Sequence, residues 1–196
     1  MSQVVFFVIF AGMVIYTYYY SLSVRPAHME QQIGAVAYPR CATLRRIAFA
    51  GMGASMVAEL LYVFFPLDIG LPLRLFGGLS GWAISIAIGL IFTGLGSWIL
   101  IKVGKAAPDS FAPRKENQMY GGIYEKIRHP QAIADVSLWF AIGFLLNSPL
   151  LVIVALLWVP QNIWLTYVEE SDLKLRFGQS YIDYMARTGR FLPQRG

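Results

Sequence analysis

Residues 133–168 read IADVSLWFAIGFLLNSPLLVIVALLWVPQNIWLTYV, two apolar runs on either side of an Asn-Ser-Pro sequence at positions 147–149. Asn, Ser and Pro favour tight turns. The flanking runs, residues 133–146 and 150–168, therefore predict a helical hairpin whose two ends return to the same side. The first run is short for a full membrane crossing, which takes about 20 residues.

Three further apolar runs precede the hairpin, at residues 4–22, 47–65 and 75–101. The 196 residues are 57% hydrophobic and 14% charged, with a mean hydropathy of +0.54, which is far more apolar than a soluble domain requires. We predict an all-α integral membrane protein of about five transmembrane helices. It forms a single membrane domain, with a three-helix part at 1–102 and a part at 103–196 that contains a loop, the hairpin and a C-terminal helix.

The basic residues are distributed unevenly along this pattern. If five helices cross the membrane, 15 of the 16 Lys and Arg residues fall on one side and only Arg74 falls on the other. Because short loops rich in Lys and Arg stay cytoplasmic, we expect the N-terminus outside the cell membrane and the C-terminus inside. The polar chemistry then lies on the cytoplasmic face.

The composition also narrows the class of partner. The formal net charge of +5 resides mostly in loops between apolar runs, where anionic lipid headgroups are closer than nucleic acid. We therefore expect membrane lipid as a partner and no nucleic acid. The single cysteine, Cys41, excludes an internal disulfide and a thiol-based metal site, and no metal site is expected.

Leu173, Phe177, Tyr181 and Tyr184 recur at helical spacing between charged residues after the hairpin. This pattern predicts an amphipathic helix at the cytoplasmic interface. Gly178 lowers the helix propensity of the segment but need not break the helix.

Arg128 and His129 end the stretch GGIYEKIRHPQ at residues 121–131, directly before the first arm of the hairpin. Pro130 suits the first turn of a helix, so Arg128 and His129 stand at a helix N-terminus, which favours an anionic group. The alternative is that Arg128 extends to lipid headgroups and His129 only caps the helix.

Glu169 and Glu170 stand at the far end of the hairpin, which must return near Arg128 and His129. Two acids beside a cation and an imidazole suit a cationic ligand or ribose hydroxyls, and simple interfacial ion pairs are the alternative. Two more acids, Glu59 and Asp135, lie within apolar runs and should face the bundle interior, a partner or water. Glu59 has no assigned role.

The stretch GIYEKIRHP at residues 122–130, the acidic pair and a downstream pattern ending in RFLP resemble the isoprenylcysteine carboxyl methyltransferase family of membrane methyltransferases. The matching downstream positions are Leu173, Phe177, Gly178, Tyr181, Tyr184, Arg190 and Pro193. The resemblance covers about residues 119–193. Two features depart from the family: Ala132 and Ala134 replace a frequent Tyr and Gly, and residues 165–168 lack the Arg that serves the substrate carboxylate in prenylcysteine enzymes.

The resemblance implies that S-adenosylmethionine binds at the cytoplasmic end of the hairpin and leaves as S-adenosylhomocysteine. The residues implied in cofactor binding are Gln118, Met119, Tyr124, His129, Pro130, Gln131 and Glu169. The implied acceptor is a lipophilic small molecule or lipidated substrate, with either a carboxylate, as in a prenylcysteine, or a lipid amine. Glu170 and Arg128 are the candidate catalytic residues, and Glu170 is a candidate base for an amine acceptor.

Two other functions fit the same architecture. A membrane reductase of sterols or enones would bind NADPH in a similar pocket, with Arg128 and Lys115 or Arg187 on the 2′-phosphate. A non-enzymatic scaffold would use the basic loops to bind anionic lipid.

Overall fold

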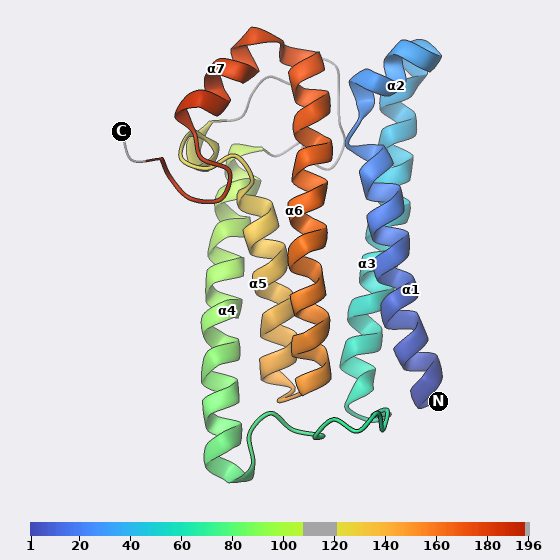
Figure 1. Cartoon of the computed structure of the whole chain (residues 1–196), viewed down its shortest axis with the longest axis vertical. Coiled ribbons are helices and arrows are strands. Elements are labelled where there is room, and N and C mark those ends of the chain that lie inside the picture. Colours follow the sequence, from blue (N-terminus) through green and yellow to red (C-terminus); the bar gives the residue numbers. More distant parts are fainter. Residues whose placement is uncertain (108–120, 195–196) are drawn as a thin grey trace.

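The computed structural model describes residues 1–107 and 121–194, and Figure 1 shows long helices standing side by side. The helices of the N-terminal half are α1 (Ser2–Ser23), α2 (Pro26–Ile33), η1 (Gly34–Val36) and α3 (Ala37–Tyr62). Those of the C-terminal half are α4 (Gly78–Ala106), η2 (Gly122–Glu125), α5 (Pro130–Leu145), α6 (Pro149–Phe177) and α7 (Gln179–Arg187). The chain is therefore an all-α integral membrane protein, as its sequence predicts.

Three helices, α1, α4 and α6, are long and apolar enough to cross a membrane. The other two helices of the predicted five, α3 and α5, differ from these three in length or polarity. α5 is apolar but has only 16 residues, and α3 has 26 residues that include three arginines and Glu59. α3 also begins at Ala37, ten residues before the predicted run at 47–65, so Arg40, Arg45 and Arg46 lie in a helix and not in a loop.

The helices pack in two groups that meet at α6. α1 packs on α3, α4 on α5 and α5 on α6, while α1 and α2 both contact α6. Where the groups meet, the ring of Trp158 stacks on Trp139 at 4.3 Å between centroids and lies 5.3 Å from the ring of Tyr16. The stacked pair joins α5 to α6, and the tilted contact between Trp158 and Tyr16 joins the two groups.

The predicted hairpin is confirmed, and its turn is hydrogen-bonded to the loop that precedes α4. Asn147 has a positive φ of 50°, and its carbonyl oxygen accepts a hydrogen bond from the Leu75 amide at 3.0 Å. The side chain of Asn147 accepts from the Phe76 amide at 3.1 Å and donates to the Phe76 carbonyl at 2.9 Å. These bonds attach the turn to the loop before α4, at the end where Figure 1 places the N-terminus.

The second arm of the hairpin is much longer than the first. α6 has 29 residues and α5 has 16, so α6 extends roughly 20 Å beyond the start of α5 at 1.5 Å per residue. α6 runs on to Phe177 instead of ending near residue 168. Gly178 has a φ of 57° and ends α6. The predicted amphipathic helix is therefore divided at Gly178, with its first part in α6 and its second part forming α7. Because glycine adopts positive φ readily, the chain turns here and α7 leads away from α6 towards η2 (Figure 1).

Candidate active site

The C-terminal segment fixes the backbone at the start of α5. The amide of Arg128 donates to the Gly189 carbonyl at 2.9 Å, and the amide of His129 donates to the Arg190 carbonyl at 3.0 Å. His129 then caps α5, with Pro130 at its first position. The two residues are thus held between α5 and the segment that follows α7.

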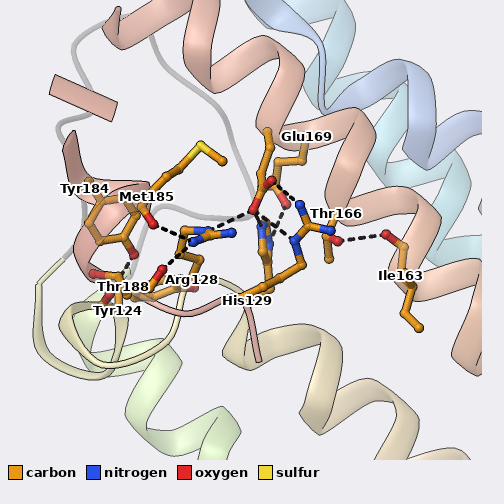
Figure 2. A network of polar contacts seen from close by, with 11 residues as sticks. Tyr124, Arg128, His129, Ile163, Thr166, Glu169, Tyr184, Met185 and Thr188 are labelled. Carbon is orange, nitrogen blue, oxygen red and sulfur yellow. Dashed lines mark hydrogen bonds and ion pairs between the residues drawn. The ribbon is translucent and has the colours of Figure 1, made fainter. Parts of the chain in front are cut away.

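Glu170 accepts hydrogen bonds from three cationic or imidazole side chains. Its Oε1 lies 2.9 Å from Nε of Arg128 and 3.1 Å from Nε2 of His129, and its Oε2 lies 2.5 Å from Nη2 of Arg190. The Glu170 side chain is only 3% exposed. Figure 2 shows these contacts converging between α6, the start of α5 and the C-terminal segment. A buried carboxylate with this many donors joins the three segments into one unit.

Arg128 also holds the end of α7. Its Nη1 donates to the carbonyl oxygens of Met185, at 3.1 Å, and of Thr188. The guanidinium of Arg128 therefore donates to acceptors of the protein itself through both Nε and Nη1. Its side chain is 8% exposed, so it does not extend to lipid headgroups.

His129 lies between the two acids. Its Nδ1 is 3.4 Å from Oε2 of Glu169 but lacks the geometry of a hydrogen bond, while Nε2 contacts Glu170. Burial alone would lower the pKa of His129, but the close contacts with the Glu169 and Glu170 carboxylates outweigh burial and raise this pKa above its ordinary value. The imidazolium form is therefore favoured at this position.

A cavity of about 330 Å³ lies beside His129, within the size range of small-molecule sites. It lies between the two helix groups, since residues of α1, α3, α4, α5, α6 and α7 line it. At one end its lining includes His129, Glu169 and Tyr184; further along α5 it includes Asp135 and Leu138, and on α3 Phe49 and Met52. The cavity is thus polar at the start of α5 and more apolar towards the membrane interior.

Two tyrosines and a glutamine form the wall between η2 and α7. The hydroxyl of Tyr184 donates to the Tyr124 carbonyl at 2.6 Å, and the hydroxyl of Tyr124 donates to Oε1 of Gln131 at 3.1 Å. Burial raises the pKa of Tyr184 to about 12, so its hydroxyl keeps its proton and remains a donor.

Asp172 positions α2 over another side of the cavity. Its carboxylate accepts from the amides of Ala27 and His28, at 3.2 and 2.9 Å, in the first turn of α2. Nδ1 of His28 lies 2.9 Å from the same carboxylate. A carboxylate here satisfies amides that have no partner within the helix, so α6 supplies the cap that α2 lacks in its own sequence.

The structure brings together most of the site residues that the sequence predicts. Those that line the cavity are Tyr124, Arg128, His129, Gln131 and Glu169. Glu170 and Pro130 are buried beside it and do not line it. Gln118 and Met119 lie outside the described residues. The predicted meeting of His129 with the acidic pair is confirmed by the distances above.

Sequence reasoning missed several side chains at this site. Arg190 was matched to a family pattern without a role, and Asp172, Tyr16, Tyr20 and Arg45 were not singled out, although the last four line the cavity. Tyr16 and Tyr20 are spaced one helical turn apart in the first apolar run, which is a weak sign of a shared face. Within residues 1–107 and 121–194, no group of three or more His, Cys, Asp or Glu side chains is arranged to hold a metal ion.

Comparison with known proteins gives a family and one relative. A model of the phospholipid methyltransferase family matches residues 79–180, more than half of the 196 residues. A phosphatidylethanolamine N-methyltransferase of Yarrowia lipolytica (strain CLIB 122 / E 150) is 24% identical over 107 residues, covering 50% of this chain but only 11% of that protein. No solved structure matches the chain. The matched range runs from α4 into α7 and includes His129 and both acids.

Proposed function

The chain belongs to the phospholipid methyltransferase family, and on that premise we propose that it transfers a methyl group from S-adenosylmethionine to the amine headgroup of a membrane lipid. The observation that carries the proposal is the cavity beside His129, which joins a polar end at Glu169 to a more apolar part within the helices. A polar cofactor and a lipid need this combination of surfaces. The reading agrees with the membrane methyltransferase that the sequence indicates and favours the lipid amine over the prenylcysteine carboxylate.

The residues around the cavity fit the proposed cofactor. Its volume of about 330 Å³ is adequate for a nucleoside-sized ligand, and Nδ1 of His129 is buried without a hydrogen-bond partner. Glu169 would accept from ribose hydroxyls or the amino group, and Tyr124, Gln131 and Tyr184 would border the nucleoside. Gln118 and Met119 remain implied by the resemblance alone. When bound, S-adenosylmethionine supplies an electrophilic methyl group on a sulfonium.

The protein's own contribution is alignment and exclusion of water, since displacement at a methyl group needs no covalent intermediate on the enzyme. Glu170 fixes the ring of His129, and Arg128 and Arg190 fix Glu170. We assign Glu170 and Arg128 to holding the catalytic geometry. A base role for Glu170 remains a separate prediction.

The other two readings find less support at the site. A reductase would need a free guanidinium for the 2′-phosphate, but Arg128 is bonded to Glu170, Met185 and Thr188, and Arg187 does not line the cavity. Lys115 lies outside the described residues. A scaffold would give no reason for burying His129 between two acids.

The test uses the full chain in lipid nanodiscs. We expect calorimetric titration to detect binding of S-adenosylhomocysteine but not of NADPH, and we expect labelled methyl groups from S-adenosylmethionine to enter phosphatidylethanolamine. His129→Ala and Glu169→Ala should weaken binding of S-adenosylhomocysteine, whereas Lys174→Ala, at an exposed position of α6, should not. Binding of NADPH without binding of S-adenosylhomocysteine would overturn the proposal.

We also propose that the site faces the cytoplasm, with the N-terminus outside. The support is the distribution of basic residues. Arg74 lies at the same end of the bundle as the hairpin turn, and most other described basic residues lie at the opposite end, where the cavity is. In a Cys41→Ser background, a cysteine at Lys174 should react with impermeant reagent only after the cell is opened, and one at Gly70 should react in intact cells. The reverse pattern would invert the orientation.

A further inference from the structure

We propose that Asp135, oriented by Tyr16, receives the ammonium group of the lipid acceptor and removes its proton before methyl transfer. This inference rests on the proposed function and adds to it a catalytic residue outside the RHP and acidic-pair motifs. Its starting point is the carboxylate of Asp135, which lies in the cavity but is not among the residues proposed to bind the cofactor.

Asp135 lies in α5, six residues after His129, which is about 9 Å further along the helix axis. It is half-buried and lines the cavity together with Tyr16, Phe49, Met52 and Leu138. The carboxylate is thus placed where the cavity wall is largely apolar. A charged group at such depth normally has a partner or faces water.

Protein partners for this carboxylate are few. Its carboxylate accepts a hydrogen bond from the hydroxyl of Tyr16, at 3.4 Å from Oδ2. Across the described segments, no Lys, Arg or His side chain forms an ion pair with Asp135. The cationic residues that line the same cavity have other partners: Arg45 bonds to the Ser23 carbonyl, Arg128 to Glu170, and Arg176 lies over Phe177.

The missing counter-charge is therefore expected from a ligand that is an organic cation. Two sources have this chemistry, the ammonium of the acceptor and the sulfonium or ammonium of the methyl donor. Position favours the acceptor, because Glu169 and His129 occupy the polar end and Asp135 is nearer the membrane interior. A lipid headgroup whose acyl chains stay among the helices reaches the Asp135 end first.

The chemical step is a proton transfer. An ammonium nitrogen has no lone pair and cannot attack a methyl group. An N–H bond of the ammonium breaks, an O–H bond forms on the Asp135 carboxylate, and the electron pair stays on nitrogen as the lone pair that then attacks. After methylation the product nitrogen carries the positive charge, and the proton on Asp135 leaves to solvent.

Glu170 is less suited to this step. Both of its oxygens already accept hydrogen bonds from Arg128, His129 and Arg190, and three donors weaken a carboxylate as a base. It also does not line the cavity. Asp135, with one tyrosine donor and an exposed face in the cavity, has the geometry that a base for the acceptor requires.

The first experiment measures turnover and donor binding in nanodiscs. Asp135→Asn should lower kcat for phosphatidylethanolamine methylation by about 100-fold or more, the usual effect of losing a general base. Affinities for S-adenosylmethionine and S-adenosylhomocysteine should both stay at the wild-type value, and Asp135→Glu should recover part of the activity. Asp183→Asn, which makes the same change on the exposed face of α7, should behave as wild type.

The second experiment needs no turnover. Native mass spectrometry would compare retention of a dioleoyl lipid with a trimethylammonium headgroup against dioleoylglycerol. The wild-type protein should prefer the cationic lipid by about ten-fold or more, as expected for a charge-assisted contact, and Asp135→Asn should lose that preference. Because the wild type alone gives this comparison, the proposal stays testable if Asp135→Asn does not fold.

Each contrary result has its own meaning. If Asp135→Asn weakens binding of S-adenosylmethionine but not of S-adenosylhomocysteine, Asp135 serves the sulfonium and the inference is wrong while the proposed function stands. Full activity of Asp135→Asn, or no lipid preference in the wild type, also overturns it. If the wild type binds neither nucleoside, the proposed function fails and this inference fails with it.

Discussion

Nη2 of Arg190 lies 2.5 Å from Oε2 of Glu170, and this contact attaches the C-terminal segment to α6. The same guanidinium lies over the ring of Tyr167, 3.6 Å from its centroid. Arg190 also supplies the carbonyl oxygen that accepts from the His129 amide. Arg190, which follows α7, therefore contacts both Glu170 and His129. We expect the cluster around Glu170 to stabilise the fold as well as the site.

Replacing Glu170 should destabilise the protein strongly. Glu170→Gln leaves Arg128 and Arg190 without their shared carboxylate, and removing one member of a buried ion pair costs about 3 to 5 kcal/mol. Thermal unfolding can be followed with a thiol-reactive dye, because Cys41 is fully buried in the folded protein. Glu169→Gln, at a side chain that is 24% exposed, should lower the melting temperature much less. Equal effects of the two variants would contradict the central position of Glu170.

His129 should make stability depend on pH. Its pKa is raised in the folded state, mainly by Glu169 and Glu170 acting against burial. The stabilisation is therefore complete below the unfolded value of about 6.5 and is lost as pH rises through the higher folded value. The melting temperature of the wild type should fall across this interval, and that of His129→Gln should fall less. Parallel pH profiles for the two proteins would show that other groups cause the change.

The hairpin and the meeting of its two ends were predictable because they depend on local features. The Asn-Ser-Pro sequence sets the turn, and two helices joined by a short turn must return to one side. This connectivity alone brings His129 to Glu169 and Glu170. When a tight turn brings two residues together, their proximity can therefore be predicted from a single sequence.

Contacts between the two helix groups were not predictable in the same way. Tyr16 reaches Asp135 across 119 positions of sequence, and Asp172 reaches His28 across 144. These pairs depend on how α1 and α2 pack against the hairpin of α5 and α6, which helical periodicity does not encode. The end of α6 was misplaced because the positive φ of Gly178 follows from where α7 packs, whereas propensity alone treats the glycine as a mild weakness.

Gly89 and Gly94 offer a matched test of packing between α4 and α5. A Cβ at Gly89 would lie 2.7 Å from Cγ and 2.9 Å from the backbone nitrogen of Leu145, whereas one at Gly94 would meet nothing within 4 Å. Gly89→Ala should therefore lower the melting temperature, because α4 must move away from α5. Gly94→Ala should leave it unchanged or raise it. If both variants melt as the wild type does, α4 and α5 do not pack this closely.

Replacing Glu59 should stabilise the protein. Its side chain is fully buried in α3, and neither carboxyl oxygen has a hydrogen-bond partner within the described residues. An unpaired buried polar group costs about 1 to 3 kcal/mol, so Glu59→Met, which keeps a similar length and removes the polar atoms, should raise the melting temperature. Glu59→Ala separates the two contributions, since it removes the same polar atoms but leaves a cavity and should gain less or lose stability. A fall in melting temperature with Glu59→Met would instead show that this carboxyl group has a partner in the membrane, and cross-linking at position 59 would then identify it.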